Sequence, residues 1–166
     1  MCGIAGLIHK NKTVNIGKEL EDMLQALKHR GPDSTGFALY GEGENNSYIM
    51  RFKVGENVKE GSSASNEGDE VYDARKAQVD KYLGELGAEV VSEDQITPYS
   101  FKYIINYDKD LMEFSKKIES VEMTEILSIG KSLELVKDIG DAGVVSKQYG
   151  LDKIRGTHAI GHTRMA

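Results

Sequence analysis

The chain has 166 residues, enough for one domain with a hydrophobic core or one domain with a large insertion, and too few for two full catalytic domains. Hydrophobic residues make up 39% and charged residues 29% of the sequence, which argues against a wholly disordered or fibrous chain. The 21 Lys and Arg residues stand against 27 Asp and Glu residues, and a net charge of −6 argues against a general nucleic-acid-binding surface.

The sequence contains a single cysteine, Cys2, so the chain alone cannot form a disulfide framework or a cysteine-rich metal site. No apolar run approaches the roughly 18 to 20 residues that a membrane span requires. The apolar stretch at the amino terminus is also too short for a signal peptide. We therefore expect a cytoplasmic protein that does not contact a membrane and binds no metal.

The first 40 residues predict a strand, a helix and a second strand. Residues 2–8 are small and apolar, as expected for a buried strand whose backbone approaches a neighbour closely. Apolar residues then recur at helical spacing, which predicts a helix over 17–28. Residues 29–33 form a breaker cluster that forces a turn, and residues 36–40 resume as a strand.

The middle of the sequence has its own pattern after a polar linker at 41–47. The predicted order is a strand at 48–54, a loop at 61–69, a helix with Val79, Tyr82, Leu83 and Leu86 on one face and Gly87 at its end, strands at 88–91 and 99–107, a helix capped by Asp110, and a strand at 126–129. This β-α-β-β-α-β order is typical of a ferredoxin-like unit. We therefore expect residues 47–129 to form a ferredoxin-like insertion.

The remaining residues are expected to lead back to the first layer. Residues 130–155 are polar, with Leu133, Val136 and Ile139 at helical spacing, so we predict a helical connection. Thr157 to Thr163 has small and β-branched residues and predicts a strand. In this interpretation, residues 1–46 and 156–166 are parts of one α+β core.

Cys2 directly follows the initiator methionine, and loss of Met1 would make it the amino terminus. An α-amine titrates near ~7.7–8.0 and a thiol near ~8.5, so the amine can take the thiol proton at little cost near neutral pH. One residue would then hold both nucleophile and base. The alternative is that Cys2 is a small buried hydrophobic residue.

Three motifs occur in one order along the chain. They are Met-Cys-Gly-Ile-Ala-Gly at 1–6, His-Arg-Gly-Pro-Asp-Ser-Thr-Gly-Phe at 29–37, and Gly-His-Thr-Arg-Met-Ala at 161–166. Together they resemble the class II glutamine amidotransferases, a family of amino-terminal nucleophile hydrolases. The resemblance implies an αββα sandwich, of which residues 1–40 and 156–166 are matching parts.

The resemblance also implies roles for single residues. Cys2 matches the nucleophile that attacks the glutamine side-chain amide, releases ammonia and leaves a thioester that water hydrolyses. Arg164 matches the arginine that grips the α-carboxylate of glutamine, for which a planar guanidinium suits a bidentate contact. Arg30 and Thr163 are further substrate-binding candidates, although Arg30 is also explained as a surface charge at a turn.

Two histidines near the last motif have simpler explanations. The α-amine of Cys2 already fills the role of the base, so His162 is better explained as a hydrogen-bonded strand histidine. His158 shares its predicted strand and face, but no cysteine or carboxylate ligands accompany the two rings. We therefore assign neither histidine to a metal site, and no cofactor-binding residue to this chain.

The family's Asn-Gly oxyanion pair and the acidic residue that holds the glutamine amino group lie downstream of its His-Thr-Arg segment. The sequence therefore looks truncated after the Gly-His-Thr-Arg motif, and the core is expected to be incomplete. One oxyanion-hole donor is commonly worth ~10²–10³ in rate, so we expect residues 1–166 alone to be nearly inactive.

The acceptor of the ammonia depends on a synthase that this sequence does not contain. The long insertion is similar to that of separate amidotransferase subunits of split, archaeal-type glutamate synthase-like systems, whose partner synthase carries FMN and an iron–sulfur cluster. The resemblance thus implies glutamine as substrate and a separate ammonia-accepting subunit as partner, and leaves a homo-oligomer open. The alternative is a non-catalytic regulatory or docking subunit that uses the inserted segment as its sensor or docking surface.

Overall fold

The computed structural model describes residues 2–10, 12–43, 46–56 and 68–164. Its internal contacts divide the chain into two units. The first unit comprises residues 1–43 and 132–166, and the inserted unit comprises residues 44–131. The insertion predicted at 47–129 lies within the second of these.

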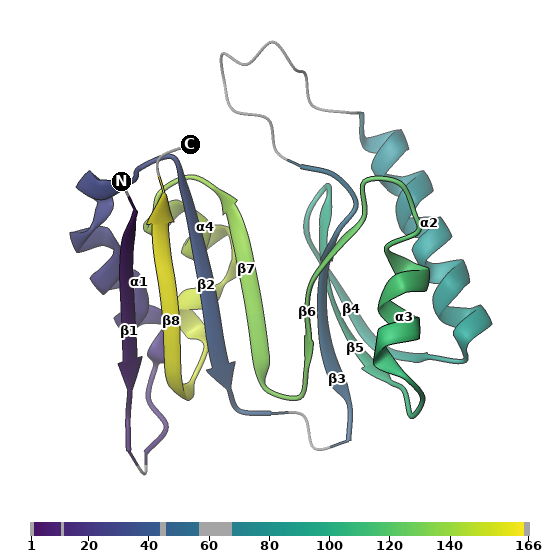
Figure 1. Ribbon diagram of the computed structural model, residues 1–166, viewed down its shortest axis with the longest axis horizontal. Helices are drawn as coiled ribbons and strands as arrows, with labels where there is room; N and C mark the ends of the chain where they lie inside the picture. Colours follow the sequence, from purple (N-terminus) through teal and green to yellow (C-terminus); the bar gives the residue numbers. More distant parts are fainter. Residues whose placement is uncertain (1, 11, 44–45, 57–67, 165–166) are drawn as a thin grey trace. The chain divides into compact units, whose positions relative to one another are not determined.

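The first unit contains a four-stranded antiparallel sheet with the order β1-β8-β2-β7 (Figure 1). Its elements are β1 (Gly3–Ile8), α1 (Ile16–Ala26), the 3₁₀ turn η1 (Lys28–Arg30), β2 (Ser34–Gly41), β7 (Leu133–Ile139), α4 (Ala142–Tyr149), the 3₁₀ turn η2 (Leu151–Lys153) and β8 (Gly156–Arg164). The first and last strands of the described chain are therefore neighbours in one sheet.

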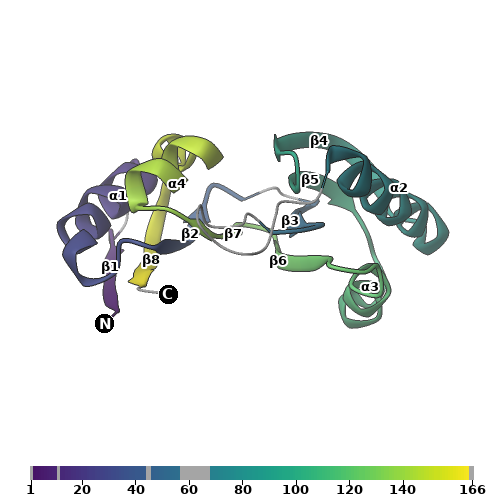
Figure 2. The ribbon, with the colours of Figure 1, turned by 90° about the horizontal axis from the view of Figure 1, so that it is seen from above.

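Both helices of the first unit cover the same face of this sheet (Figure 2). The Asn15 side chain caps α1 by accepting a hydrogen bond from the Lys18 amide at 3.0 Å. Leu20 and Leu24 are fully buried on α1. Their side chains reach β8 at Gly161, where a Cβ would lie 2.7 Å from Leu24 Cδ1.

The prediction of a helical connection over 130–155 is wrong in its first part, because Leu133–Ile139 is strand β7. The buried face of β7 carries Glu134, Val136 and Asp138, so polar side chains occupy two positions where an apolar alternation would have indicated a strand. The Asp138 carboxylate accepts a hydrogen bond from the Tyr149 hydroxyl at 2.6 Å. The helical part of the prediction is limited to α4 and η2, which belong to the first unit.

The inserted unit contains a second four-stranded antiparallel sheet with the order β4-β5-β3-β6. Its elements are β3 (Tyr48–Lys53), α2 (Asp69–Leu86), β4 (Glu89–Thr97), β5 (Ser100–Asn106), α3 (Leu111–Ile118) and β6 (Glu125–Gly130). Along the chain they follow the predicted sequence of strand, helix, two strands, helix and strand.

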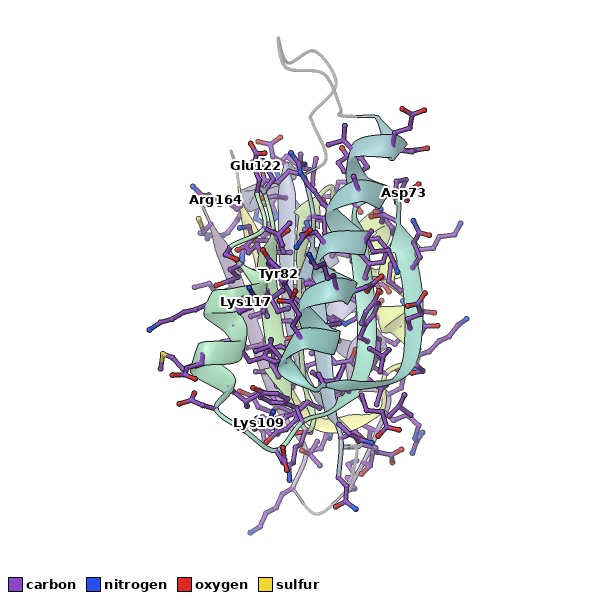
Figure 3. All side chains as sticks on the ribbon, turned by 90° about the vertical axis from the view of Figure 1, so that its right-hand side faces the viewer. Asp73, Tyr82, Lys109, Lys117, Glu122 and Arg164 are labelled. Atoms are coloured by element: carbon purple, nitrogen blue, oxygen red, sulfur yellow. The ribbon has the colours of Figure 1, made fainter. Side chains whose placement is uncertain are left out.

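Aromatic side chains form the centre of the inserted unit. Phe52 on β3 packs against Phe101 and Tyr103 on β5, with ring centroids 5.3 and 5.1 Å apart. Residues from α2 and α3, including fully buried Phe114, belong to the same hydrophobic cluster. The two helices also touch at the surface, where the Lys117 ammonium lies 3.8 Å from the centroid of the Tyr82 ring (Figure 3).

Two local predictions for this unit are confirmed. Gly87 ends α2 with φ of 78°, the left-handed conformation that glycine adopts without strain. Asp110 caps α3 by accepting hydrogen bonds from the amides of Met112 and Glu113. Most of the loop predicted at 61–69 lies outside the described residues, and Asp69 opens α2. In the described part of the chain, no helix has both the length and the apolar character needed to cross a membrane.

Candidate functional site

Cys2 directly precedes β1, and its side chain is exposed. Within residues 1–166, Cys2 is therefore not the buried hydrophobic residue that the alternative describes. Gly3 and Ala5 of β1 are buried, whereas the side chain of Ile4 between them is 71% exposed on the other face. Gly3 pairs with Thr163, so Cys2 lies at the end of the sheet where β8 ends (Figure 1).

Arg164 is the last residue of β8, and its side chain is exposed. Thr163 is 1% exposed, and its hydroxyl points to the carbonyl of Leu27 at the end of α1. Because side chains alternate along a strand, Arg164 lies on the face away from the helices. We call this the open face, and it carries Ile4, Ile8, Ile160, His162 and Arg164. The structure thus brings Cys2 and Arg164 to the same end of neighbouring strands.

The turn between α1 and β2 is built against the backbone of Arg164. Pro32 forms an isolated bridge with Arg164, and the Asp33 amide donates a hydrogen bond to the Arg164 carbonyl at 3.2 Å. Gly31 is buried at the same point. A Cβ there would lie 2.5 Å from the Arg164 carbonyl carbon, so only glycine fits without a backbone shift.

Two other glycines approach the two residues before Arg164 in the same close way. A Cβ on Gly36 would lie 2.4 Å from His162 Nε2, and a Cβ on Gly3 would lie 2.9 Å from Thr163 Oγ1. His162, Thr163 and Arg164 therefore each occupy the space left by a glycine of a different segment: β2, β1 and the turn. This interlocking gives one physical reason for the three sequence motifs to occur together.

The two histidines of β8 lie on the open face in different surroundings. The His162 ring lies over Gly36, and burial together with the nearby positive charges of Arg164 and Lys137 lowers its pKa below the usual 6.5. The His158 ring stacks on Tyr40 with centroids 4.0 Å apart. His162 lies in strand β8 as predicted, but no hydrogen bond from its ring is found within the described ranges, so the predicted hydrogen bond is not observed.

The open face is strongly apolar beyond the end that carries Cys2 and Arg164. Ile8 is 82% exposed and Ile160 is 52% exposed. A shallow cavity of about 380 Å³ lies on this face among Ile4, Gly36, Leu135 and other residues of the four strands. An apolar surface of this kind on one side of a sheet is normally covered by another layer.

The two further substrate-binding candidates lie in different places. Arg30 ends η1, and its side chain is exposed beside the turn that contacts Arg164. Thr163 faces α1 instead, so its side chain and that of Arg164 point to opposite faces of the sheet. The structure therefore does not bring Thr163 to the open face, and its substrate-binding role stays a prediction.

The sequence did not predict the contacts that connect the turn after α1 with the start of α4. Asp141 accepts hydrogen bonds from Gln25 on α1 and Lys28 in η1, both at 2.8 Å, and also caps α4. The Lys28 contact is the main cause that lowers the pKa of Asp141 to about 2. An acidic residue before a short helix is a capping signal, but the contacts across 113 and 116 residues have no local signature.

The side chains described here suggest no metal centre. Among the described residues, no group of three or more His, Cys, Asp or Glu is arranged to hold a metal ion. Cys2, the thiol of the chain, directly precedes Gly3, which pairs with Thr163 at the end of β8 that carries Arg164. The described side chains at this end of the sheet include an exposed thiol and an exposed guanidinium.

Comparisons with known proteins point in the same direction. No protein-family model matches the sequence. A protein of Methanothermobacter thermautotrophicus with the provisional name of a glutamine amidotransferase is 33% identical over 171 residues, which cover 100% of this chain and 52% of that protein. The glutamine amidotransferase-like protein GlxB of Rhizobium meliloti is 28% identical over 172 residues, covering 100% of this chain and 50% of that protein.

The chain spans about half the length of these curated relatives. Both similarities cover the first unit and the inserted unit together, since they extend over the whole chain. The names of the two relatives support a glutamine amidotransferase family for this chain.

Proposed function

We propose that the full-length protein is a class II glutamine amidotransferase that hydrolyses glutamine through Cys2. The observation that carries the proposal is the position of an exposed Cys2 and an exposed Arg164 at the same end of paired strands. A thiol and a guanidinium on one face can engage the two ends of a glutamine molecule. The names of the two relatives support the same reaction class.

The proposed chemistry uses the thiolate of Cys2. After removal of Met1, which lies outside the described residues, the α-amine of Cys2 would accept the thiol proton. The thiolate attacks the side-chain amide carbon of glutamine, the C–N bond breaks, and the nitrogen leaves as ammonia with the transferred proton. Water then hydrolyses the γ-glutamyl thioester, which releases glutamate and restores the thiol.

Arg164 would bind the α-carboxylate of glutamine in this scheme. Its planar guanidinium can donate two parallel hydrogen bonds to a carboxylate, which an ammonium group cannot reproduce. The contacts of Gly31, Pro32 and Asp33 fix the Arg164 backbone from one side. This support limits how far the Arg164 backbone can move relative to β1.

The proposed fold of the core is the αββα sandwich of amino-terminal nucleophile hydrolases. The first unit has one antiparallel sheet with helices on one face and an apolar open face, as one half of such a sandwich would have. We propose that a second sheet of the full-length protein packs on the open face. A full-length structure with Ile8 and Ile160 in contact with solvent would contradict this.

We also propose that the inserted unit is ferredoxin-like. Its order of elements and its sheet order β6-β3-β5-β4 support the assignment, because the first and third strands of the unit are then central and the two helices share one hydrophobic cluster. A full-length structure in which this sheet had a different strand order would refute it.

The proposed partner is a separate synthase subunit that accepts the ammonia, in a glutamate synthase-like system. The FMN and the iron–sulfur cluster of that system would be carried by the partner. Residues 1–166 could not hold a cluster alone, since a cluster needs several Cys thiolates and this sequence has one Cys. Glutamine labelled at the amide nitrogen tests the idea. With the partner present, label should enter the product even when unlabelled ammonia is in excess in solution.

The activity itself is tested in the full-length protein by measuring ammonia and glutamate release. Cys2→Ala should abolish both, and intact mass should show whether Met1 has been removed. Arg164→Ala should raise the KM for glutamine roughly 10- to 100-fold, the value of a charge-assisted pair. Arg155→Ala, which changes an exposed arginine just before β8, is the matched control and should leave KM unchanged.

The alternative of a non-catalytic docking subunit makes the opposite prediction. In that case the wild-type protein releases no ammonia from glutamine, and Cys2→Ala changes nothing. The exposed thiol beside Arg164 favours the enzyme, because a scaffold requires neither group at this position.

A further inference from the structure

Thr163 is a neighbour of both Cys2 and Arg164, but its side chain faces the opposite side of the sheet. It precedes Arg164 on β8 and pairs with Gly3, the residue that follows Cys2. Its side chain is 1% exposed and points away from the open face. Thr163 is therefore next to both proposed functional residues, but its side chain does not face the side of the sheet on which they lie.

The Thr163 hydroxyl fills the space beneath Gly3. A Cβ on Gly3 would lie 2.9 Å from Thr163 Oγ1 and 3.1 Å from Leu27 Cβ, so these two side chains enclose Gly3 on the helix side. Strand pairing fixes Gly3 within the plane of the sheet. The Thr163 and Leu27 side chains fix its height above α1, and with it the direction in which the chain leaves toward Cys2.

The same hydroxyl reaches the turn that supports Arg164. Thr163 Oγ1 donates a hydrogen bond to the Leu27 carbonyl at 3.4 Å. That carbonyl also accepts a hydrogen bond from the Arg30 amide at 2.9 Å, which closes η1 just before Gly31. One buried hydroxyl thus touches the segment that carries Cys2 and the segment that is packed against Arg164.

From this arrangement we infer that Thr163 is a positioning residue, which sets the distance and angle between the Cys2 thiol and the Arg164 guanidinium. The inference rests on the proposed function. A glutamine held at its α-carboxylate presents its amide carbon at a fixed distance, so the thiol must be placed to match. A misplacement of 1 Å can cost about 10²-fold in rate.

Thr163→Val tests the inference with little change in shape. The new methyl group is larger than the hydroxyl by a few tenths of an ångström and cannot donate to Leu27, so Gly3 should be pushed away from α1. In the full-length protein we expect kcat for glutaminase activity to fall at least fivefold. The KM for glutamine should stay within twofold, because the Arg30 amide still donates to the Leu27 carbonyl and the turn keeps its contacts with the Arg164 backbone. Thr163→Ser, which keeps the hydroxyl, should retain more than half of kcat.

Two covalent reagents distinguish a misplaced Cys2 from a misfolded protein and from a thiol of altered reactivity. A glutamine-shaped diazoketone should label Cys2 of Thr163→Val at least fivefold more slowly than wild type, while chloroacetamide should label both at rates within twofold. Rates are normalised to the labelled fraction at completion, so a partly unfolded sample does not imitate the effect. Thr157→Val, at the exposed start of β8, is the matched control and should behave as wild type.

The outcomes distinguish this inference from the proposed function. An active wild type with an unchanged kcat in Thr163→Val overturns the positioning role and leaves the glutaminase standing. A wild type that releases no ammonia overturns both. If Thr163→Val does not fold, Thr163→Ala replaces it under the same criteria, since it removes the support beneath Gly3 without adding bulk.

Discussion

Gly31 lies against the main chain of Arg164 so closely that a Cβ at position 31 would be 2.5 Å from the Arg164 carbonyl carbon and 2.6 Å from its Cα and its nitrogen. All three atoms belong to the backbone, so no side-chain rotation can relieve the clash. The turn after α1 and the end of β8 are therefore fitted to each other at a single glycine. This contact couples the position of the turn to that of the proposed carboxylate anchor.

Gly31→Ala should consequently displace Arg164. We expect the free energy of unfolding to fall by about 1–3 kcal/mol, the usual cost of forcing an extra methyl into a packed site. The KM for glutamine should rise while Cys2 remains reactive toward chloroacetamide. Urea unfolding and steady-state kinetics of the full-length protein measure the two effects.

Gly68→Ala provides the control for this substitution, because a Cβ at Gly68 meets no atom within 4 Å. It should cost about 0.5–1 kcal/mol, because Gly68 is the N-cap of α2, where alanine is disfavoured, and it should leave KM unchanged. A Gly31→Ala protein with wild-type stability and KM would show that the turn does not constrain Arg164.

Two helical glycines should respond to alanine with opposite signs. Alanine normally stabilises a helix by about 0.5–1 kcal/mol relative to glycine, and a Cβ on Gly84 of α2 meets nothing within 4 Å. A Cβ on Gly17 of α1 would lie 1.7 Å from the Leu151 carbonyl oxygen. Gly84→Ala should therefore stabilise the inserted unit, and Gly17→Ala should destabilise the first unit despite its better helix propensity.

Hydrogen exchange measures the two effects separately, because the amides of each unit report the local unfolding of that unit. Amides of α2 should exchange more slowly in Gly84→Ala, and amides of α1 should exchange faster in Gly17→Ala. Slower exchange in both variants would contradict the close approach of α1 to η2.

His162 should make the first unit sensitive to mild acid. Its pKa is below 6.5 in the folded protein because of burial and then the charges of Arg164 and Lys137. Its strand partners, Ile4 and Gly36, carry no charge. The unfolded chain therefore binds the proton more readily, and stability falls as the pH drops through 6.5 toward the folded pKa. Below both the folded and the unfolded pKa of His162, this loss of stability is complete.

His162→Gln should remove this part of the pH dependence. The difference in unfolding free energy between pH 7.5 and pH 5.5 should be smaller in the variant than in wild type, as measured by urea unfolding. His29→Gln, at an exposed position in η1, is the control. An NMR titration in which the His162 ring protonates above 6.5 would reverse the expected sign.

Local signals in the sequence predicted most of the elements. Asp110 and Gly87 act at the ends of single helices, so their capping roles follow from residue type and position alone. Strand β7 escaped prediction because Glu134 and Asp138 occupy its buried face, where Asp138 is satisfied by Tyr149. A buried acidic side chain can be assigned to a strand only when the group that hydrogen-bonds to it is known.

The candidate site was predictable in part for similar reasons. The approach of Cys2 to Arg164 depends on the pairing of the first strand with the last, and the motifs indicated that pairing only through the family resemblance. Strand alternation alone would have placed Thr163 and Arg164 on opposite faces. The fit of three glycines against residues 162–164 has no signature in the sequence, because it is a matter of tenths of an ångström between distant segments.

Asp141 should stabilise the first unit through two separable effects. It caps α4 by accepting hydrogen bonds from the amides of Gly143 and Val144, and it binds Lys28 and Gln25 from the other end of the chain. Asp141→Ala should lower the free energy of unfolding by at least about 1 kcal/mol at pH 7, because it removes the cap together with the contacts to Lys28 and Gln25. Asp141→Asn should keep the cap and lose only the charge interaction with Lys28.

The acid dependence distinguishes the two effects. Since the pKa of Asp141 is lowered from 3.8 to about 2, its charge contributes stability that is fully present above pH 3.8. That contribution is lost as the pH falls through about 2. Wild type should therefore be more stable than Asp141→Asn at pH 5, and the difference should become small near pH 2 and vanish below it. Exchange rates of α4 amides follow this change, and Asp110→Ala, which removes the cap of α3, should leave them unaltered. A constant difference between wild type and Asp141→Asn from pH 5 to pH 2 would show that the Lys28 contact does not stabilise the turn.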